Sequence, residues 1–188
     1  MDSRIDNFII RQPDGTTRPS NSLVLGEGLT VTETAGGIPE LRGSLNGAFF
    51  GAKLWTTDVV PVPNMVETTV PFNQESVDVG NFHSPAQPSR LTVPAGGAGV
   101  YLVVARGVFA GSPQALRITG FRKNGGDIAG LSRMDSAAPG TTVVATEILR
   151  LEAGDYLEMM MYHDGGVTTN AYTGFPYETS FMITRLGV

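Results

Sequence analysis

Apolar and polar residues alternate with a period of two along much of this 188-residue chain. In residues 29–33, Leu29, Val31 and Glu33 alternate with two threonines, and β-branched residues at this spacing are typical of a β-strand. From residue 67 onward the alternating segments lengthen, and Gly, Pro or Asn-Gly separates them. The pattern predicts strands over 70–73, 76–83, 90–93, 100–109, 116–121, 142–151, 156–162 and 181–186. About eight strands at such spacing are typical of an all-β sandwich or jelly roll.

Two of the predicted strands are apolar on both faces. Residues 100–109 contain a single charged residue, and residues 156–162 read Tyr-Leu-Glu-Met-Met-Met-Tyr. In the second strand Leu157, Met159 and Met161 point one way, and Tyr156, Met160 and Tyr162 point the other. One face of a sandwich strand packs on the opposite sheet, so the other face must also be covered. An oligomer interface is the simplest cover.

The first third of the chain contains shorter β-like fragments separated by turn signals. Residues 8–10 are followed by Pro-Asp-Gly, a turn in which Pro presets φ and Gly tolerates positive φ. The strand over 29–33 leads into a Gly-Gly hairpin turn, from which residues 41–50 return. Residues 60–64, Val-Pro-Val-Pro-Asn, form an extended connector because alternating prolines stiffen the backbone.

The connector predicts a boundary between an N-terminal β-hairpin region over 1–66 and a head domain over 67–188. A unit of two or three strands is marginally stable alone, so we expect it to dock on the head, on copies of itself or on a partner. Phe49, Phe50 and Trp55 lie just before the connector. Packing within the protein is the simpler interpretation of these aromatic residues, and an anchor inserted into a partner is the alternative.

Composition supports the all-β interpretation and narrows the function. The chain has 24 Gly and 12 Pro. Inside a helix, each Gly would cost about 1 kcal/mol and each Pro about 3 kcal/mol relative to Ala. A net charge of −5 excludes the uniformly basic surface of a non-specific nucleic-acid-binding protein. The absence of cysteine excludes disulfides, thiol nucleophiles and zinc–thiolate sites. We find no signal peptide and no apolar run of membrane-spanning length, so we expect synthesis in the cytoplasm.

Candidate chemistry in the sequence is sparse. His83 on a predicted strand and His163 at a strand end are far apart, and no Gly-x-Ser-x-Gly motif accompanies them. A metal-dependent cupin enzyme would need clustered histidines with a nearby Glu. Loop carboxylates such as Asp155 and Asp164 could bind calcium, but no Asp-x-Asp-x-Asp-Gly array is present. We therefore expect no enzymatic activity, no metal and no cofactor.

Two loops near the C-terminus, residues 165–172 and 174–177, mix small polar and aromatic residues. Such side chains together are typical of loops that contact sugars. Asn170, Tyr172 and Tyr177 are the candidate contacts, and ordinary loop packing explains them equally well.

Several short motifs occur in the order and spacing of a known family. They are Val70-Pro71-Phe72-Asn73, Leu91-Thr92-Val93-Pro94, Gly99-Val100-Tyr101, Arg122-Lys123-Asn124-Gly125-Gly126, Leu149-Arg150-Leu151-Glu152-Ala153-Gly154-Asp155-Tyr156 and Thr179-Ser180-Phe181. In this order they resemble the trimeric jelly-roll family of complement globular heads and tumour necrosis factors, over residues 67–188. The resemblance implies a TNF-like jelly roll and a homotrimer in which Tyr156, Met160 and Tyr162 line the three-fold axis.

Two of these motifs are turns with a physical reason to recur. Lys123-Asn124-Gly125 supplies the positive φ values that a tight hairpin needs. Ala153-Gly154-Asp155 supplies a turn in which the Asp side chain bonds the local backbone. The chain departs from the family at Leu91, which replaces its usual aromatic residue.

The N-terminal third has no counterpart in the animal members of this family. Residues 23–33 with the Gly-Gly hairpin look like segments common in bacteriophage virion proteins, which are Gly- and Thr-rich, free of cysteine and without a signal sequence. This resemblance implies a non-enzymatic homotrimeric virion protein. Its N-terminal region, with Phe49, Phe50 and Trp55, would attach to capsid or tail proteins while the head projects outward.

Within the virion, the short chain favours capsid decoration or a head fibre over a tail fibre, because a fibre usually adds a shaft. The alternative is a receptor-binding head of a tail fibre or baseplate. That head would recognise host-surface glycans through Asn170, Tyr172 and Tyr177.

Overall fold

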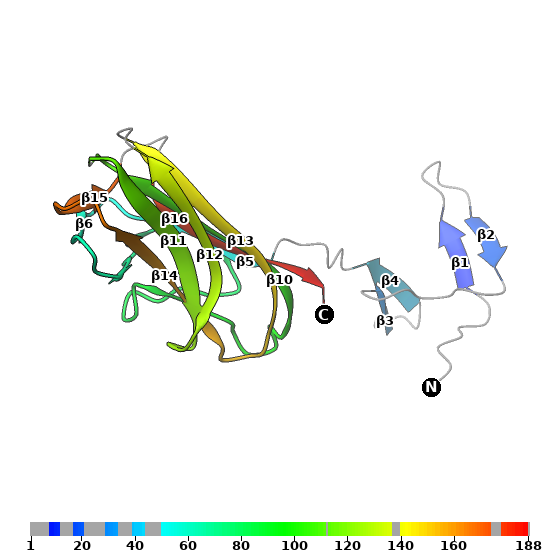
Figure 1. The fold of residues 1–188 in the computed structure, drawn as a ribbon. Helices are drawn as coiled ribbons and strands as arrows, with labels where there is room; N and C mark the ends of the chain where they lie inside the picture. The colour runs from blue at the N-terminus through cyan, green and yellow to red at the C-terminus, as the bar shows by residue number, and fades with distance from the viewer. Residues whose placement is uncertain are drawn as a thin grey trace. The chain divides into compact units, whose positions relative to one another are not determined.

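The computed structural model describes strands β1 (Phe8–Arg11), β2 (Thr17–Ser20), β3 (Leu29–Glu33) and β4 (Pro39–Gly43), followed by residues 50–111, 113–136, 140–173 and 178–187 (Figure 1). Contacts divide the chain into two compact units, Met1–Ala48 and Phe49–Val188. The first unit contains two antiparallel hairpins, β1 with β2 and β3 with β4. Strand β3 coincides with the alternating segment over 29–33 from which a strand is predicted.

The second unit begins earlier than the boundary predicted at residue 66. β5 (Gly51–Trp55) pairs with β16 (Ser180–Gly187), and β6 (Val60–Val62) pairs with β15 (Thr169–Ala171). The prediction of an inter-domain connector over 60–64 is therefore wrong. The alternating prolines do keep the segment extended, but Val60 and Val62 are buried in the core and the segment serves as a strand.

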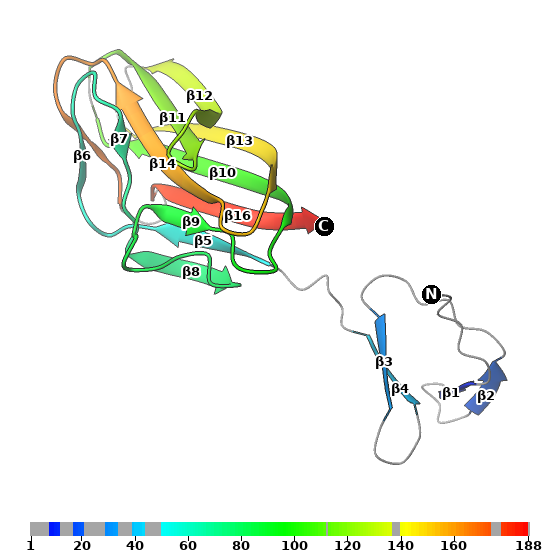
Figure 2. The same ribbon diagram turned by 90° about the horizontal axis from the view of Figure 1, so that it is seen from below.

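Two antiparallel sheets pack face to face in the second unit (Figures 1 and 2). The large sheet has seven strands in the order β6-β15-β10-β16-β5-β8, and β13 pairs with β10. The small sheet has five strands in the order β12-β11-β14-β7, and β9 pairs with β14. The remaining bounds are β7 Thr68–Thr69, β8 Gln74–Val79, β9 Arg90–Thr92, β10 Gly99–Phe109, β11 Ala115–Lys123, β12 Ile128–Ser136, β13 Thr141–Leu151 and β14 Tyr156–His163.

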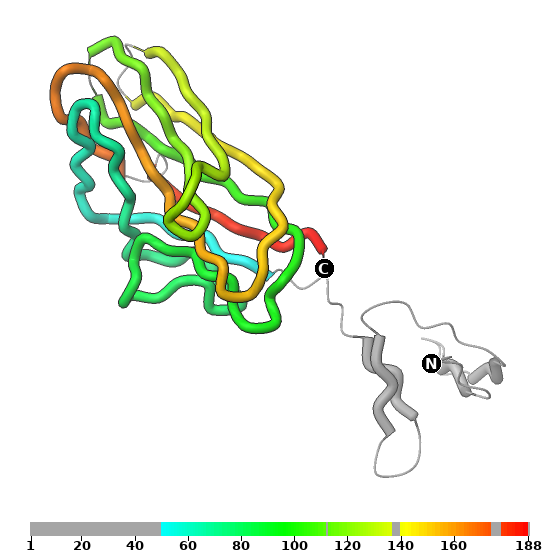
Figure 3. The backbone as a smooth tube through the Cα atoms, turned by 60° about the horizontal axis from the view of Figure 1, so that its bottom comes forward, coloured from blue at the N-terminus to red at the C-terminus, as the bar shows by residue number. Residues whose placement is uncertain are grey.

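The chain passes repeatedly from one sheet to the other, as its path in Figure 3 shows. β10 and β11 are consecutive but lie in different sheets, and so do β12 and β13. This crossing pattern is that of a jelly roll. The all-β, jelly-roll prediction is confirmed.

Alternate residues of both sheets fill the space between them. Tyr101, Val103 and Phe109 of β10 and Leu157 and Met159 of β14 are fully buried members of one core cluster. Burying an apolar side chain of this size stabilises the fold by about 1.5–3 kcal/mol. The two strands that the sequence predicts to be apolar on both faces therefore each direct one set of residues into the core.

Three local predictions are wrong. The sequence predicts no strand over β12, because Gly and polar residues interrupt its apolar ones and most of its side chains are exposed or partly exposed. Residues 70–73 lie outside the strands, although Val70 is buried in the core. His83 lies in a loop, because positive φ values of 122° at Gly80 and 62° at Asn81 end β8 before it.

The two predicted turn motifs contact each other. Asn124 and Gly125 have φ values of 53° and 66° between β11 and β12, as the hairpin motif predicts. Asp155 accepts the Glu152 amide at 2.8 Å within its own turn, which confirms the predicted local bond. The same carboxylate accepts Asn124 Nδ2 at 2.7 Å and lies 2.7 Å from Lys123 Nζ. Asp155 thus ties the hairpin tip to the turn that precedes β14.

These contacts favour the charged form of Asp155. Burial by itself raises the pKa of Asp155, but the bonds from Lys123, Asn124 and the Glu152 amide outweigh it, so the pKa lies below its ordinary value. The folded-state pKa is therefore lower than that of the unfolded chain, which is about 3.9. The carboxylate stabilises the fold above the unfolded-state pKa, and this contribution is lost as the pH falls through the folded-state pKa.

We predict that Asp155→Asn lowers the free energy of unfolding by about 2 kcal/mol at neutral pH, because it removes a charge-assisted contact in a half-buried site. The difference from the wild type should shrink as the pH falls below about 4. Chemical denaturation at several pH values and one protein concentration measures both effects. Asp127→Asn, at an exposed position of the same hairpin tip, is the matched control. An equal loss in the control, or a difference that does not change with pH, would contradict this role of Asp155.

Candidate functional site: the open face of the large sheet

The large sheet has an apolar face that points away from the small sheet. Its apolar residues and Thr184, which we call the open face, are Val100, Leu102, Val104, Val144, Ile148, Met182 and Thr184, from β10, β13 and β16. Arg106, Thr146 and Arg150 point the same way, because they pair with Val144, Val104 and Val100. Strand pairing sets Leu102 between Thr184 and Ile148, and the other members lie beside this row. Ile148 is 61% exposed and Val144 is 45% exposed. Exposed apolar residues that gather on one sheet face make this face the candidate contact site.

Strand β10 explains why this face exists. It pairs with β13 along one edge and with β16 along the other, so hydrogen bonds satisfy its backbone on both sides. Its residues then alternate between the core and the open face, with Tyr101 and Val103 buried and Leu102 and Val104 half-buried on the outside. The sequence predicts that both faces of residues 100–109 are covered. The core covers one face, so the cover of the other would have to lie on the open face.

A second set of exposed apolar residues lies on β12. Ile128 and Leu131 are 43% and 44% exposed on the outer side of the small sheet, and we call them the edge patch because β12 is the outermost strand of that sheet. Met134, 47% exposed, points to the opposite side, since it pairs with the buried Arg117. Arg133, also exposed, lies on the same side of β12 as Leu131. The edge patch belongs to the small sheet and the open face to the large sheet, so one copy offers two different apolar surfaces.

The residues predicted to line a three-fold axis lie on β14, on the outer side of the small sheet. Met160 is 3% exposed, and it packs beside Gly120, where an added Cβ would lie 2.9 Å from Met160 Cε. The Arg90 guanidinium lies 3.9 Å from the ring centre of Tyr156, and Tyr162 is half-buried. The protein's own chain covers much of this surface. The axis role of Tyr156, Met160 and Tyr162 stays a prediction.

The aromatic residues predicted to attach to a partner begin the second unit. The Phe50 ring packs edge-on against Phe82 at 5.1 Å between centroids, and the Arg185 guanidinium lies 4.4 Å from its centre. Packing within this unit therefore accounts for Phe50. Trp55 is half-buried on β5, and Phe49 lies outside the described residues. An attachment role for the three residues stays a prediction.

Two of the three predicted sugar-contact residues are exposed on neighbouring positions. Asn170 lies in β15 and Tyr172 follows it with 39% exposure, while Tyr177 lies outside the described residues. The Tyr172 amide donates to the Val108 carbonyl at 2.7 Å, and the Asn170 carbonyl accepts the Ala110 amide at 2.9 Å. The backbone is thus held against β10 while both side chains remain exposed. Sugar binding by this loop stays a prediction.

Sequence reasoning missed a buried carboxylate beside the open face. Glu178 precedes β16 and is 6% exposed, and its Oε1 lies 3.5 Å from Lys53 Nζ. Lys53 alternates in β5 with the core residues Ala52 and Leu54, so its side chain lies on the open-face side. No pattern in the sequence signals this contact, because Glu178 and Lys53 are 125 positions apart.

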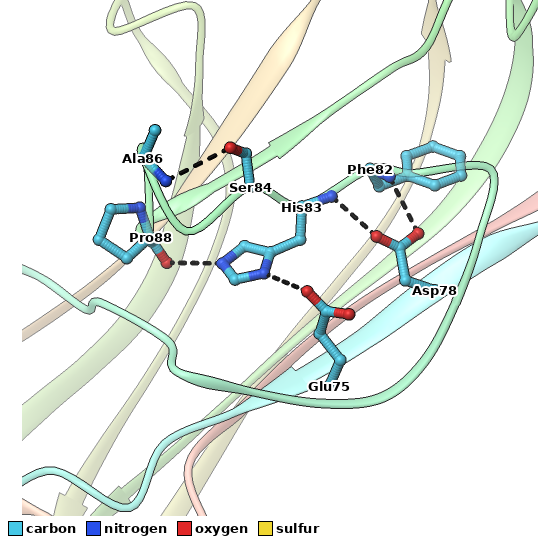
Figure 4. Close-up of polar contacts among 7 residues, drawn as sticks. All are labelled: Glu75, Asp78, Phe82, His83, Ser84, Ala86 and Pro88. Carbon is cyan, nitrogen blue, oxygen red and sulfur yellow. Dashed lines mark hydrogen bonds and ion pairs between the residues drawn. The ribbon is translucent and has the colours of Figure 1, made fainter.

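His83 lies in a surface hollow, where it holds a loop in place (Figure 4). Its Nδ1 is 2.7 Å from Glu75 Oε1, and its Nε2 is 3.3 Å from the Pro88 carbonyl oxygen. The Asp78 carboxylate accepts the amides of Phe82 and His83 at 2.9 and 3.0 Å. Phe72, Asn73, Gln74, Glu75, His83, Pro85 and Pro88 line a cavity of about 360 Å³. The His83 side chain is 3% exposed and both ring nitrogens face partners, so its geometry is that of a structural residue.

His163 is fully buried at the end of β14. The Gly165 amide donates to Nδ1 at 3.1 Å, so Nε2 carries the proton and donates to the Val62 carbonyl at 2.8 Å. Both histidines therefore join backbone segments, whereas a general base needs a nitrogen within reach of a substrate. Across the part of the chain that the structure describes, no group of three or more side chains could hold a metal ion. The same part contains no helix of membrane-spanning length and apolarity.

Known structures resemble the second unit. Murine APRIL at pH 8.5 is 15% identical with a TM-score of 0.54, over 73% of this chain and 99% of that chain. Eiger TNF from S. frugiperda is 16% identical with a TM-score of 0.51, over 74% of this chain and 93% of that chain. No protein-family model matches the sequence, and no curated protein gives a significant match. The second unit therefore has the TNF-like jelly-roll fold that its motifs predict.

Proposed function

We propose that this chain is a non-enzymatic structural protein that self-associates through its open face into a homotrimer. The observation that carries the proposal is the exposure of Ile148 beside half-buried Leu102, with which it pairs, on a face that also carries Val100, Val104 and Met182. Covering such a surface with a second copy contributes about 25 cal/mol per Å² of apolar area removed from water. Self-association therefore has a clear driving force.

The presence of two different apolar surfaces favours a ring over a two-fold dimer. A two-fold dimer uses the same patch on both copies, whereas a contact between unlike patches continues from copy to copy until a ring closes. The edge patch is an apolar surface available for contact with the open face of the next copy. The number three comes from the resemblance to trimeric jelly-roll proteins.

We predict that the purified protein has three times the 19.9 kDa mass of one chain, and that Ile148→Asp shifts it towards one chain mass. The substitution would bury an unpaired charge in the interface, which weakens association more than about tenfold. Ile148 is exposed in a single copy, so the far-ultraviolet circular dichroism of the variant should match that of the wild type. Sedimentation equilibrium at micromolar concentration measures the masses.

Val59→Asp is the matched control, because Val59 is 67% exposed in the loop between β5 and β6, away from the open face. It should leave the mass unchanged. A wild-type protein with the mass of one chain, or an Ile148→Asp variant that assembles as tightly as the control, would refute the interface.

We further propose that the protein is part of a bacteriophage virion, as a capsid decoration or head fibre made in the host cytoplasm. The Gly- and Thr-rich N-terminal hairpins and the absence of cysteine support it. The first unit, Met1–Ala48, is compact in itself and is the natural attachment element. Three copies of a weakly binding hairpin unit on one trimer would bind a symmetric site on the particle with avidity.

We predict that a chain beginning at Phe49 still trimerises, because it keeps β5 and every strand of both sheets. It should lose at least about tenfold in affinity for virions that lack this protein, since the avidity of three attachment units is gone. Co-sedimentation of full-length and shortened protein with such virions measures the difference. Equal binding of the two would exclude attachment through the first unit.

The second candidate function is a receptor-binding head of a tail fibre or baseplate that recognises host-surface glycans. The side-by-side exposure of Asn170 and Tyr172 favours it, since a sugar needs an aromatic face and a polar group together. We predict that Tyr172→Ala abolishes any signal of the protein on a glycan array, while Val79→Ala, exposed on β8 at the opposite edge of the large sheet, keeps it. The second candidate fails if the wild-type protein binds no glycan on the array.

A further inference from the structure

Asn124, at the tip of the hairpin between β11 and β12, is held by both polar atoms of its side-chain amide. Its Nδ2 donates to Asp155 Oδ1 at 2.7 Å, and its Oδ1 accepts the Tyr156 amide at 2.8 Å. Its backbone amide donates to the Tyr156 carbonyl at 2.9 Å. These contacts fix an asparagine that is itself exposed to solvent and has a positive φ of 53°.

The residue that follows Asn124 makes it chemically reactive. Gly125 has no side chain to hinder an approach to its backbone nitrogen, and both residues are exposed to water. In an Asn-Gly pair the glycine nitrogen attacks the side-chain carbonyl carbon of the asparagine, and a cyclic succinimide forms. The side-chain nitrogen takes up the proton of the glycine amide and leaves as ammonia. Water then opens the ring and gives aspartate or isoaspartate.

The contacts of Asn124 oppose this reaction. Its side-chain carbonyl carbon must turn towards the Gly125 nitrogen, and this movement breaks the bonds to Asp155 and to the Tyr156 amide. The bond to Asp155 is the stronger of the two, because an ionised acceptor strengthens a hydrogen bond. Such a bond lowers the population of the open, reactive arrangement at least about tenfold. The fold therefore protects an exposed Asn-Gly pair.

We propose that Asn124 is a deamidation site that its bond to Asp155 protects, and that deamidation releases the hairpin tip from the turn before β14. The product has a carboxylate in place of the Nδ2 donor, so it cannot donate to Asp155. Two like charges would then lie where a hydrogen bond of 2.7 Å joins the two side chains. Lys123 Nζ, 2.7 Å from Asp155 Oδ2, can neutralise only one of them. The modified tip therefore cannot close again as before.

The deamidation rate of the wild-type protein tests the protection. At mildly alkaline pH, Asn124 should convert at least about tenfold more slowly in the folded protein than in guanidinium chloride, where no contact protects it. Mass spectrometry of peptides measures the conversion. Asn46-Gly47 is a second Asn-Gly pair, so its rate in guanidinium chloride is the reference for an unprotected pair. Equal rates for Asn124 in the folded and the unfolded protein would overturn the proposal.

Asp155→Ala tests whether Asp155 provides the protection. In the folded variant the rate at Asn124 should rise at least about tenfold, because the charged acceptor is lost. Asp127→Ala, at an exposed position of the same hairpin tip, is the matched control for the loss of one negative charge and should leave that rate unchanged. The rate at Asn46 should be the same in both variants. Asn124 reacting no faster in a folded Asp155→Ala variant than in the control would overturn the role of Asp155.

Asn124→Asp tests the release of the hairpin tip, because it creates the charge of the deamidated product. It should lower the midpoint of chemical denaturation at neutral pH. Adding Asp155→Asn should restore part of the loss, since the introduced amide can donate to the new carboxylate. Asn170→Asp, the same change at an exposed position of β15, is the matched control and should leave the midpoint unchanged. A midpoint for Asn124→Asp equal to that of the control would overturn the release.

Discussion

Strand β10 is the element on which both the core and the open face depend. Its two edges are paired, so its side chains have only two directions available, and both are apolar. Tyr101 and Val103 fill the core while Leu102 and Val104 face outward. A shift of one residue in register would exchange these sets, so the register that builds the core also leaves the open face uncovered. The proposed self-association would cover the face that the sandwich leaves open.

Polar contacts fix the positions of turns and loops around the sandwich, where apolar packing alone does not hold the chain. Asp155 joins a hairpin tip to the turn before β14, and His83 with Glu75 pins the loop after β8. In each case the polar partners lie within one copy and the geometry is short and direct. Glu178 differs, because its only described ion pair is long and one of its oxygens lacks a donor.

The division of the chain into two units gives the proposed function a physical basis. The hairpins of Met1–Ala48 are compact in themselves, while the head begins at Phe49 and includes β5 and β6. A module that assembles by one surface and attaches by another unit can vary the attachment unit without disturbing the core. The similarity to APRIL and Eiger is 15–16% in sequence identity and shows the jelly-roll fold alone, so it identifies no binding partner for this chain.

The sequence by itself determined the features that depend on neighbouring residues. Period-two alternation located β10, and the positive φ values at Asn124 and Gly125 follow from local turn chemistry. Tertiary structure alone decided which strands pair: β6 with β15 across more than a hundred residues, and Met160 beside Gly120. It also buried Glu178 beside Lys53. These outcomes could not be predicted, because the burial of one side chain depends on which distant strand lies beside it and not on its own segment.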